Sequence, residues 1–144
     1  LQASVADKIR SVHAELSEDD RDAQRWGRLG MVYEANRLVE LADECYRSAQ
    51  TLAPEEPEWI YRRAGIAHRL GRTEQALAGM RAVLRQRPDY GAAVWQLGSW
   101  QLAQGELDAA ENTFRDGIEA APRFAGAWAG LARVHLQRDE RWKR

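Results

Sequence analysis

The sequence predicts an all-α protein, a solenoid of helix–turn–helix units that repeat with a fixed period. Three observations lead to this fold class. Pro54, Pro88 and Pro122 follow one another at equal intervals, apolar residues recur at three- and four-residue spacing within each interval, and small residues occupy equivalent positions of every unit. The apolar spacing is typical of amphipathic helices, and a fixed period of about 34 residues is typical of stacked helical repeats.

Composition sets the broad class of protein. The 144 residues are enough for one domain with a hydrophobic core. A net charge of −1 gives no electrostatic drive toward nucleic acid or an anionic membrane. No apolar run approaches the roughly 20 residues that a membrane span needs, and "LQASVADKIR" shows no signal peptide. We expect a soluble chain. Because Cys45 is the single cysteine, the sequence leaves its compartment open between cytoplasm and periplasm.

The first complete unit covers residues 23–56 and shows why each helix begins and ends. A first helix leads to a turn near Arg37, and a second helix ends before Pro54, since proline disfavours helical geometry in the residue before it and has no backbone N–H. Gly30 and Ala42 are small, which lets the two helices approach to the usual distance of about 8–10 Å. The same logic predicts units at 57–90 and 91–124, with turns at Gly71 and Gly105.

The two ends of the chain depart from this pattern. Residues 1–22 carry an apolar stripe and predict a separate helix, either a cap or a degenerate second helix of an earlier unit, with Ser17 as N-cap of the helix that follows. The stripe consists of Leu1, Val5, Ile9, Val12 and Leu16. Residues 125–144 predict the first helix of an incomplete fourth unit, with a weak turn signal at Asp139 and a stripe of Trp128 and Leu131 that lacks its usual cover. Either the tail covers that stripe, with Trp142 folding back, or another chain does.

The unit resembles the tetratricopeptide repeat, and residues 23–56 carry the whole signature of that family. Its signature residues here are Trp26, Leu29, Gly30, Tyr33, Ala42, Tyr46, Ala49 and Pro54. The third unit keeps most of them, whereas the second has Arg63 and Ala67 where Leu and Tyr are expected. The resemblance covers about residues 23–144. It implies a right-handed solenoid whose first helices line a concave groove, and it implies binding of another protein or a peptide there.

The resemblance also implies which side chains face the groove. From those positions we select a candidate site rich in arginine and aromatic residues, a composition typical of binding hot spots. The candidate residues are Arg28, Met31, Tyr61, Arg62, Arg69, Trp95, Gln96, Ser99 and Arg133. Arginine recognises carboxylates bidentately, so we expect a peptide of acidic character, with Tyr61 and Trp95 as anchors. The alternative is that the arginines form a solvated face and the two aromatics pack between helices.

Most of the other tryptophans are predicted to have a structural role. We expect four tryptophans to pack in the core or between units: Trp26, Trp59, Trp100 and Trp128.

Some tetratricopeptide domains of chaperone-associated proteins hold a C-terminal carboxylate with Lys and Asn. The corresponding positions here are Gly27, Met31, Arg62, Ala92 and Gln96. Only two of those five are polar, which argues against that clamp.

The sequence points to no catalytic, cofactor or metal site. His13, His68 and His135 lie far apart on separate predicted helices, without the i, i+4 spacing of a helical metal pair. Cys45 is flanked by Asp43 and Glu44, whose charges oppose thiolate formation. No phosphate-binding or nucleophile motif occurs. We therefore expect a protein that is not an enzyme and needs no cofactor.

Two classes of function stay open at this point. The first is a protein-interaction scaffold; the alternative is a regulatory or oligomerisation module cut from a larger bacterial multi-domain or envelope-assembly protein. RNA binding is disfavoured by the near-neutral charge. The uncovered stripe near the C-terminal end also predicts a homodimer through the terminal helices. The alternative is that the chain is a piece of a longer array.

Overall fold

The computed structural model describes residues 4, 7, 10, 11, 14 and 21–143. Across residues 21–143 the regular secondary structure is entirely α-helical. Its helices are α2 (Ala23–Ala35), α3 (Val39–Leu52), α4 (Pro57–Arg69), α5 (Thr73–Gln86), α6 (Gly91–Ala103), α7 (Leu107–Ala120) and α8 (Ala125–Trp142). The first helices α2, α4, α6 and α8 begin at equivalent positions of successive units.

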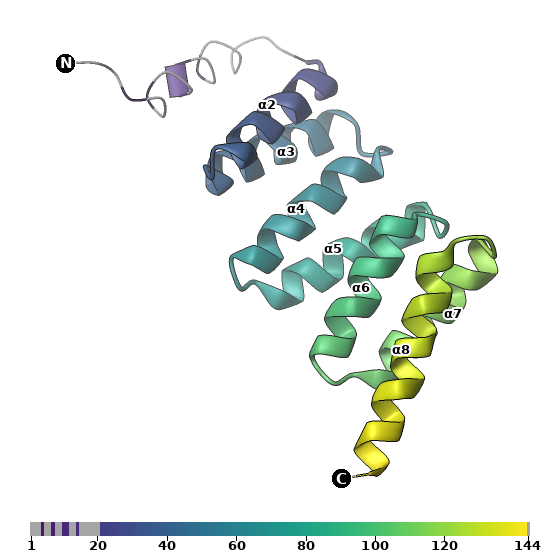
Figure 1. Ribbon diagram of the computed structural model, residues 1–144. Coiled ribbons are helices and arrows are strands. Elements are labelled where there is room, and N and C mark those ends of the chain that lie inside the picture. The colour runs from purple at the N-terminus through teal and green to yellow at the C-terminus, as the bar shows by residue number, and fades with distance from the viewer. Residues whose placement is uncertain (1–3, 5–6, 8–9, 12–13, 15–20, 144) are drawn as a thin grey trace.

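The helices stack in chain order and form a solenoid. Each one packs against the helix before it, from α2 through α8, and α6 also contacts α8. Figure 1 shows this succession from the purple to the yellow end of the chain, with neighbouring helices antiparallel. The predicted all-α solenoid fold is confirmed.

Prolines and turn residues act where the sequence predicts. The residues before the three repeated prolines, Ala53, Arg87 and Ala121, have φ values of −136°, −137° and −144° and end α3, α5 and α7. The turns inside the units adopt positive φ, at 62° for Arg37 and 76° for both Gly71 and Gly105. Glycine reaches this left-handed region without a Cβ penalty, whereas Arg37 adopts it at a steric cost.

Small residues allow close approach between paired helices. A Cβ atom on Gly98 of α6 would lie 2.2 Å from Cζ of Phe114 on α7, and one on Gly130 of α8 would lie 2.2 Å from Cε1 of the same ring. In the first unit a Cβ on Gly30 would lie 2.6 Å from Cε1 of Tyr46. These glycines are therefore required by packing rather than by a turn.

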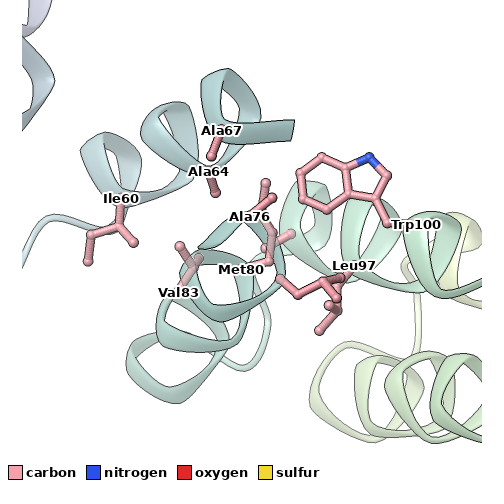
Figure 2. Close-up of a cluster of buried hydrophobic side chains, with 10 residues drawn as sticks. Ile60, Ala64, Ala67, Ala76, Met80, Val83, Leu97 and Trp100 are labelled. Carbon is pink, nitrogen blue, oxygen red and sulfur yellow. The ribbon is translucent and has the colours of Figure 1, made fainter. Parts of the chain in front are cut away.

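The core runs along the solenoid as three consecutive clusters, each shared by three successive helices. Figure 2 shows the middle one, where α4 contributes Ile60, Ala64 and Ala67, α5 contributes Ala76, Met80 and Val83, and α6 contributes Leu97 and Trp100. Met80 and Val83 are fully buried. Because each cluster joins one unit to the next, neighbouring units stabilise each other, as expected for a repeat array.

Several expectations at the ends of the chain are wrong. Trp26, Trp59 and Trp100 are buried, but Trp128 is 53% exposed and its Nε1 donates a hydrogen bond to the carbonyl of Pro122 at 2.8 Å. In a complete unit the residue at the position of Trp128 contacts the second helix, but in the described part of the chain no helix follows α8. Asp139 lies inside α8 rather than at a turn, since α8 continues to Trp142 without a glycine or proline that would favour a stop.

Trp142 is 91% exposed at the end of α8 and does not fold back over the stripe. The N-cap of α2 is Asp22, not Ser17: the Asp22 carboxylate accepts a hydrogen bond from the Gln24 N–H at 2.9 Å. The stripe predicted from Leu1 to Leu16 lies outside the described residues.

Salt bridges fix α8 on α7. The Arg138 guanidinium donates to Asp108 at 2.5 Å and to Glu111 at 3.0 Å. The hydrogen bond from Arg138 lowers the pKa of Glu111. This contact holds the outer half of α8 in place beyond the small residues that pack against Phe114.

Candidate functional site

A groove of about 490 Å³ crosses three successive first helices. Residues of α2, α4 and α6 line it, so its shape depends on the stacking of the units rather than on any one of them. The lining consists of Met31, Glu34, Ala35, Arg62, Gly65, His68, Arg69, Gln96 and Trp100. We call this surface the groove.

A network of charges centred on Glu34 occupies the α2–α4 part of the groove. Arg69 of α4 donates to Glu34 at 2.7 Å, the hydroxyl of Tyr46 donates to it at 3.3 Å, and a guanidinium nitrogen of Arg62 lies 4.0 Å away. Arg62 also donates to Glu58 at 3.2 Å, one helical turn earlier. Burial, and then the charge of Glu34, raise the pKa of Tyr46. The two arginines that face the groove are therefore already paired within the protein.

An aromatic pair forms the α4–α6 part of the groove. The His68 and Trp100 rings stack with centroids 4.3 Å apart and an angle of 6° between their planes. Gly65 lies beside this pair, and a Cβ atom built on it meets nothing within 4 Å. Met31 is 40% exposed on the neighbouring helix α2. The groove thus combines a flat aromatic floor, an exposed thioether and a free space above Gly65.

The structure brings four of the nine candidate residues together in the lining of the groove: Met31, Arg62, Arg69 and Gln96. Arg28 is exposed on α2 outside that lining and has no ion pair or hydrogen bond within the described part of the chain.

The remaining four candidates pack against other side chains. The half-buried Tyr61 lies against Tyr90, with ring centroids 5.6 Å apart. Trp95 lies against Phe114 at 6.3 Å, and the exposed Arg133 extends over the Trp95 ring, 5.6 Å from its centroid. The hydroxyl of Ser99 is sealed from solvent. The aromatic contacts are those of the alternative in which Tyr61 and Trp95 pack between helices.

The resemblance placed Glu34 and His68 at groove-facing positions, but sequence reasoning did not predict their contacts, and it assigned Trp100 to the core rather than to the groove. Glu34 and Arg69 lie one repeat plus one position apart, so opposite charges at that spacing on successive first helices are a usable signal. His68 and Trp100 lie slightly less than one repeat apart, also on neighbouring first helices. A search for side chains near one repeat length apart would find both pairs.

The described residues offer little for chemistry. Within them no group of three or more His, Cys, Asp or Glu side chains is placed to hold a metal ion. Among the described helices, none combines the length and apolar character required to cross a bilayer. Burial raises the pKa of the Cys45 thiol to about 12, and the neighbouring Glu44 adds to this.

The stacked units and the groove across their first helices define the class of protein: an α-solenoid of helical repeats, which presents an extended binding surface. A family model described as "Tetratricopeptide repeat" matches residues 28–91, 61–122 and 96–142. The chain belongs to the tetratricopeptide repeat family, as the resemblance of residues 23–144 predicts.

Individual relatives are distant. Superkiller complex protein 3 of Mus musculus is 27% identical over 99 residues, which make up 69% of this chain and 6% of that protein. The chain spans between 6% and 11% of the length of the curated relatives that it matches.

Solved structures share the fold. The Sgt2 TPR domain from Aspergillus fumigatus has a TM-score of 0.72 at 21% identity, over 85% of this chain and 82% of that one. The first TPR of Spaghetti (RPAP3), bound to the HSP90 peptide SRMEEVD, has a TM-score of 0.69 at 20% identity, over 83% of this chain and 94% of that one.

Proposed function

We propose that this chain is a protein-interaction scaffold whose groove holds a peptide segment of a partner protein. The observation that carries the proposal is the groove itself, which crosses α2, α4 and α6 and presents the His68–Trp100 pair beside the open space at Gly65. A ligand surface made by three units is wide enough for an extended or helical segment.

The chemistry of the groove supports a partner with both apolar and acidic side chains. An apolar side chain fits against Met31 and the His68–Trp100 floor. A carboxylate of the partner replaces Glu34 at Arg69, since Arg69 is half exposed and can turn outward, while Glu34 keeps the Tyr46 hydroxyl at 3.3 Å and the Arg62 guanidinium at 4.0 Å. We therefore expect the partner to present an acidic side chain at this point, because the arginines of the groove find no further unpaired acceptor within it.

The mode differs from capture of a terminal carboxylate. At the positions of the chaperone-type clamp the groove presents Met31, Arg62 and Gln96, and Arg62 is held by Glu58 and Tyr46. Spaghetti (RPAP3) binds an acidic peptide that ends in Asp. For the present chain we propose recognition of internal acidic side chains instead, so amidation of a peptide's C-terminus is expected to leave its affinity unchanged.

A substitution that fills the groove without touching the core tests the proposal. In Gly65→Trp the new side chain enters free space, so the fold is retained while the groove is blocked. Ala78→Trp, exposed on α5, is the matched control. Quantitative pull-downs are expected to recover the same partners with wild type and Ala78→Trp and to lose them with Gly65→Trp. Full retention by Gly65→Trp would show that the groove is not the binding surface.

A further inference from the structure

A second and larger hollow lies between α5 and α7, with α6 as its floor, and has a volume of about 780 Å³. We call it the outer cleft. It faces away from the groove, because α6 presents Gln96 and Trp100 to the groove but Val94, Leu97 and Gln101 to the outer cleft. The proposed function of the groove does not use this surface.

The equivalent interval one unit earlier, between α3 and α5, is bridged by polar side chains. Arg63 of α4 donates to Asp43 at 3.0 Å and to Gln50 at 2.8 Å, which ties α4 to α3. Gln86 at the end of α5 donates to the backbone carbonyl of Pro54 at 3.0 Å. The two hydrogen bonds of Arg63 join the floor of this interval to its α3 wall, and the hydrogen bond of Gln86 joins its α5 wall to the loop after α3.

One repeat later, every one of those side chains is replaced by an apolar residue. Leu97 stands in the position of Arg63, Leu77 in that of Asp43, Leu84 in that of Gln50 and Ala120 in that of Gln86. The side chains of these replacements neither donate nor accept a hydrogen bond, so they cannot tie α5 to α7 across the interval. The outer cleft therefore follows from a change of residue type within a constant repeat.

The floor of the outer cleft also carries one unused donor. Gln101 is only 3% exposed, and its Oε1 accepts a hydrogen bond from the hydroxyl of Thr113 at 2.7 Å. Its amide nitrogen has no acceptor among the described residues, yet it is not sealed from solvent. A buried amide in this state favours an occupant that brings an oxygen atom to it.

The rim of the outer cleft has opposite charges on its two walls. Arg81 and Arg85 are exposed on α5, and Asp116 and Glu119 are exposed on α7. None of the four has an ion pair or a hydrogen bond in the described part of the chain. The charges of the two walls do not pair with each other, so they are available to an occupant with the complementary pattern.

The walls favour a helical occupant over an extended one. Both walls and the floor are α-helices, whose backbone groups are bonded internally, so an extended peptide would exchange its bonds to water for very few new ones. A helix satisfies its own backbone groups and needs only its side chains to fit. The α7 wall runs from Ala109 to Ala120, about 17 Å of helix, or roughly three turns.

The geometry points to the outer cleft as a docking site for an amphipathic helix of a partner protein, about three turns long. The apolar stripe of that helix lies on Leu84 and Leu97. Its acidic residues face α5 and its basic residues face α7. This interaction is independent of the groove. It gives the chain two binding surfaces on opposite sides of the solenoid.

Synthetic peptides provide the probe. Fluorescein-labelled helical peptides of about 14 residues carry leucines at i, i+3, i+4 and i+7. The mixed peptide has Glu on one flank and Lys on the other, and the basic peptide has Lys on both. Wild-type protein is expected to bind the mixed peptide about tenfold more tightly in fluorescence anisotropy. Arg81→Glu/Arg85→Glu makes both walls acidic, and the preference is expected to reverse in favour of the basic peptide, whereas the exposed control Arg72→Glu keeps the wild-type order.

A second variant closes the outer cleft with residues the chain already uses. Leu84→Gln/Leu97→Arg/Ala120→Gln restores the side chains found at Gln50, Arg63 and Gln86 and is expected to weaken the mixed peptide at least tenfold, while Gly65→Trp leaves its affinity unchanged. If thermal unfolding shows that this variant is not folded, the arginine pair alone decides.

Five results would overturn the proposal: no binding by wild type, an unchanged peptide preference in Arg81→Glu/Arg85→Glu, equal binding by wild type and the closed variant, loss of the peptide only in Gly65→Trp, or a concentration-dependent dimer that the closed variant abolishes. The last result would assign the cleft to a second copy of the chain.

Discussion

Two glycines that lie inside first helices give opposite predictions for substitution by alanine. Gly65 of α4 and Gly98 of α6 both lie inside a helix, where glycine costs about 0.5–1 kcal/mol relative to alanine. A Cβ atom on Gly65 meets nothing within 4 Å, so Gly65→Ala is expected to gain that whole amount in free energy of unfolding. The melting temperature then rises by about 2–4 °C per kcal/mol for a chain of this size.

Gly98→Ala gains the same helix propensity but collides with a ring that cannot move away. Its Cβ would lie 2.2 Å from Cζ of Phe114, which is fully buried and also lies against Gly130 on the other side. Forcing an extra methyl group into a packed core costs about 1–3 kcal/mol. We expect a net loss of about 1–2 kcal/mol, so the two variants differ by roughly 2 kcal/mol or more.

Urea unfolding followed by circular dichroism measures both variants under the same conditions. Phe114→Leu removes the end of the ring, so Gly98→Ala is expected to cost less in a Phe114→Leu background than in the wild-type one, and a double-mutant cycle gives that coupling energy. The packing argument is refuted if Gly65→Ala and Gly98→Ala shift the midpoint in the same direction by the same amount.

Three further predictions concern buried groups and the end of the array. Burial raises the pKa values of Tyr33 and Cys45 to about 12. The free energy of unfolding is therefore expected to be constant below about pH 8 and to fall as the pH rises toward 12. Ellman's reagent at about pH 8 is expected to label Cys45 only in urea. Arg63→Leu leaves the carboxylate of Asp43 poorly paired and is expected to cost about 1–3 kcal/mol in urea unfolding, whereas Asp43→Leu/Arg63→Leu recovers most of it; an additive double variant would contradict this. The homodimer through the terminal helices stays a prediction: sedimentation at tens of micromolar is expected to show a dimer for wild type and a monomer for Trp128→Glu, and a wild-type monomer would exclude it.

The sequence was sufficient for the fold because the signals that set the period are local. A proline ends a helix whatever surrounds it, and Pro54 and Pro88 do so in the structure. Gly71 and Gly105 adopt the left-handed turn conformation that their residue type permits. Arg37 adopts the turn conformation without glycine, whereas α8 continues through Asp139 at the same position of the repeat, so the position alone does not determine the turn.

The contacts of the candidate site were harder to predict because its long side chains contact residues of neighbouring helices. Arg69 was expected to face a ligand, but the structure pairs it with Glu34 on the preceding first helix. Trp95 was expected to anchor a peptide, yet it lies against Phe114 under Arg133. These choices depend on the distance between neighbouring helices, which residue spacing alone does not give.

The two proposed binding surfaces share one physical origin, which is variation in positions that do not set the period. Arg63 and Leu97 occupy the same position of successive units, and the first closes its interval with hydrogen bonds while the second leaves the outer cleft open. The residues that fix helix ends and helix distances lie elsewhere in the unit, at the prolines and glycines. Exchanging the bridging residues between units is therefore expected to move the cleft by one unit without changing the helical content. Circular dichroism and the mixed peptide together test this: if the exchanged protein keeps its helical content but binds the mixed peptide as wild type does, the residues at these positions do not determine the cleft.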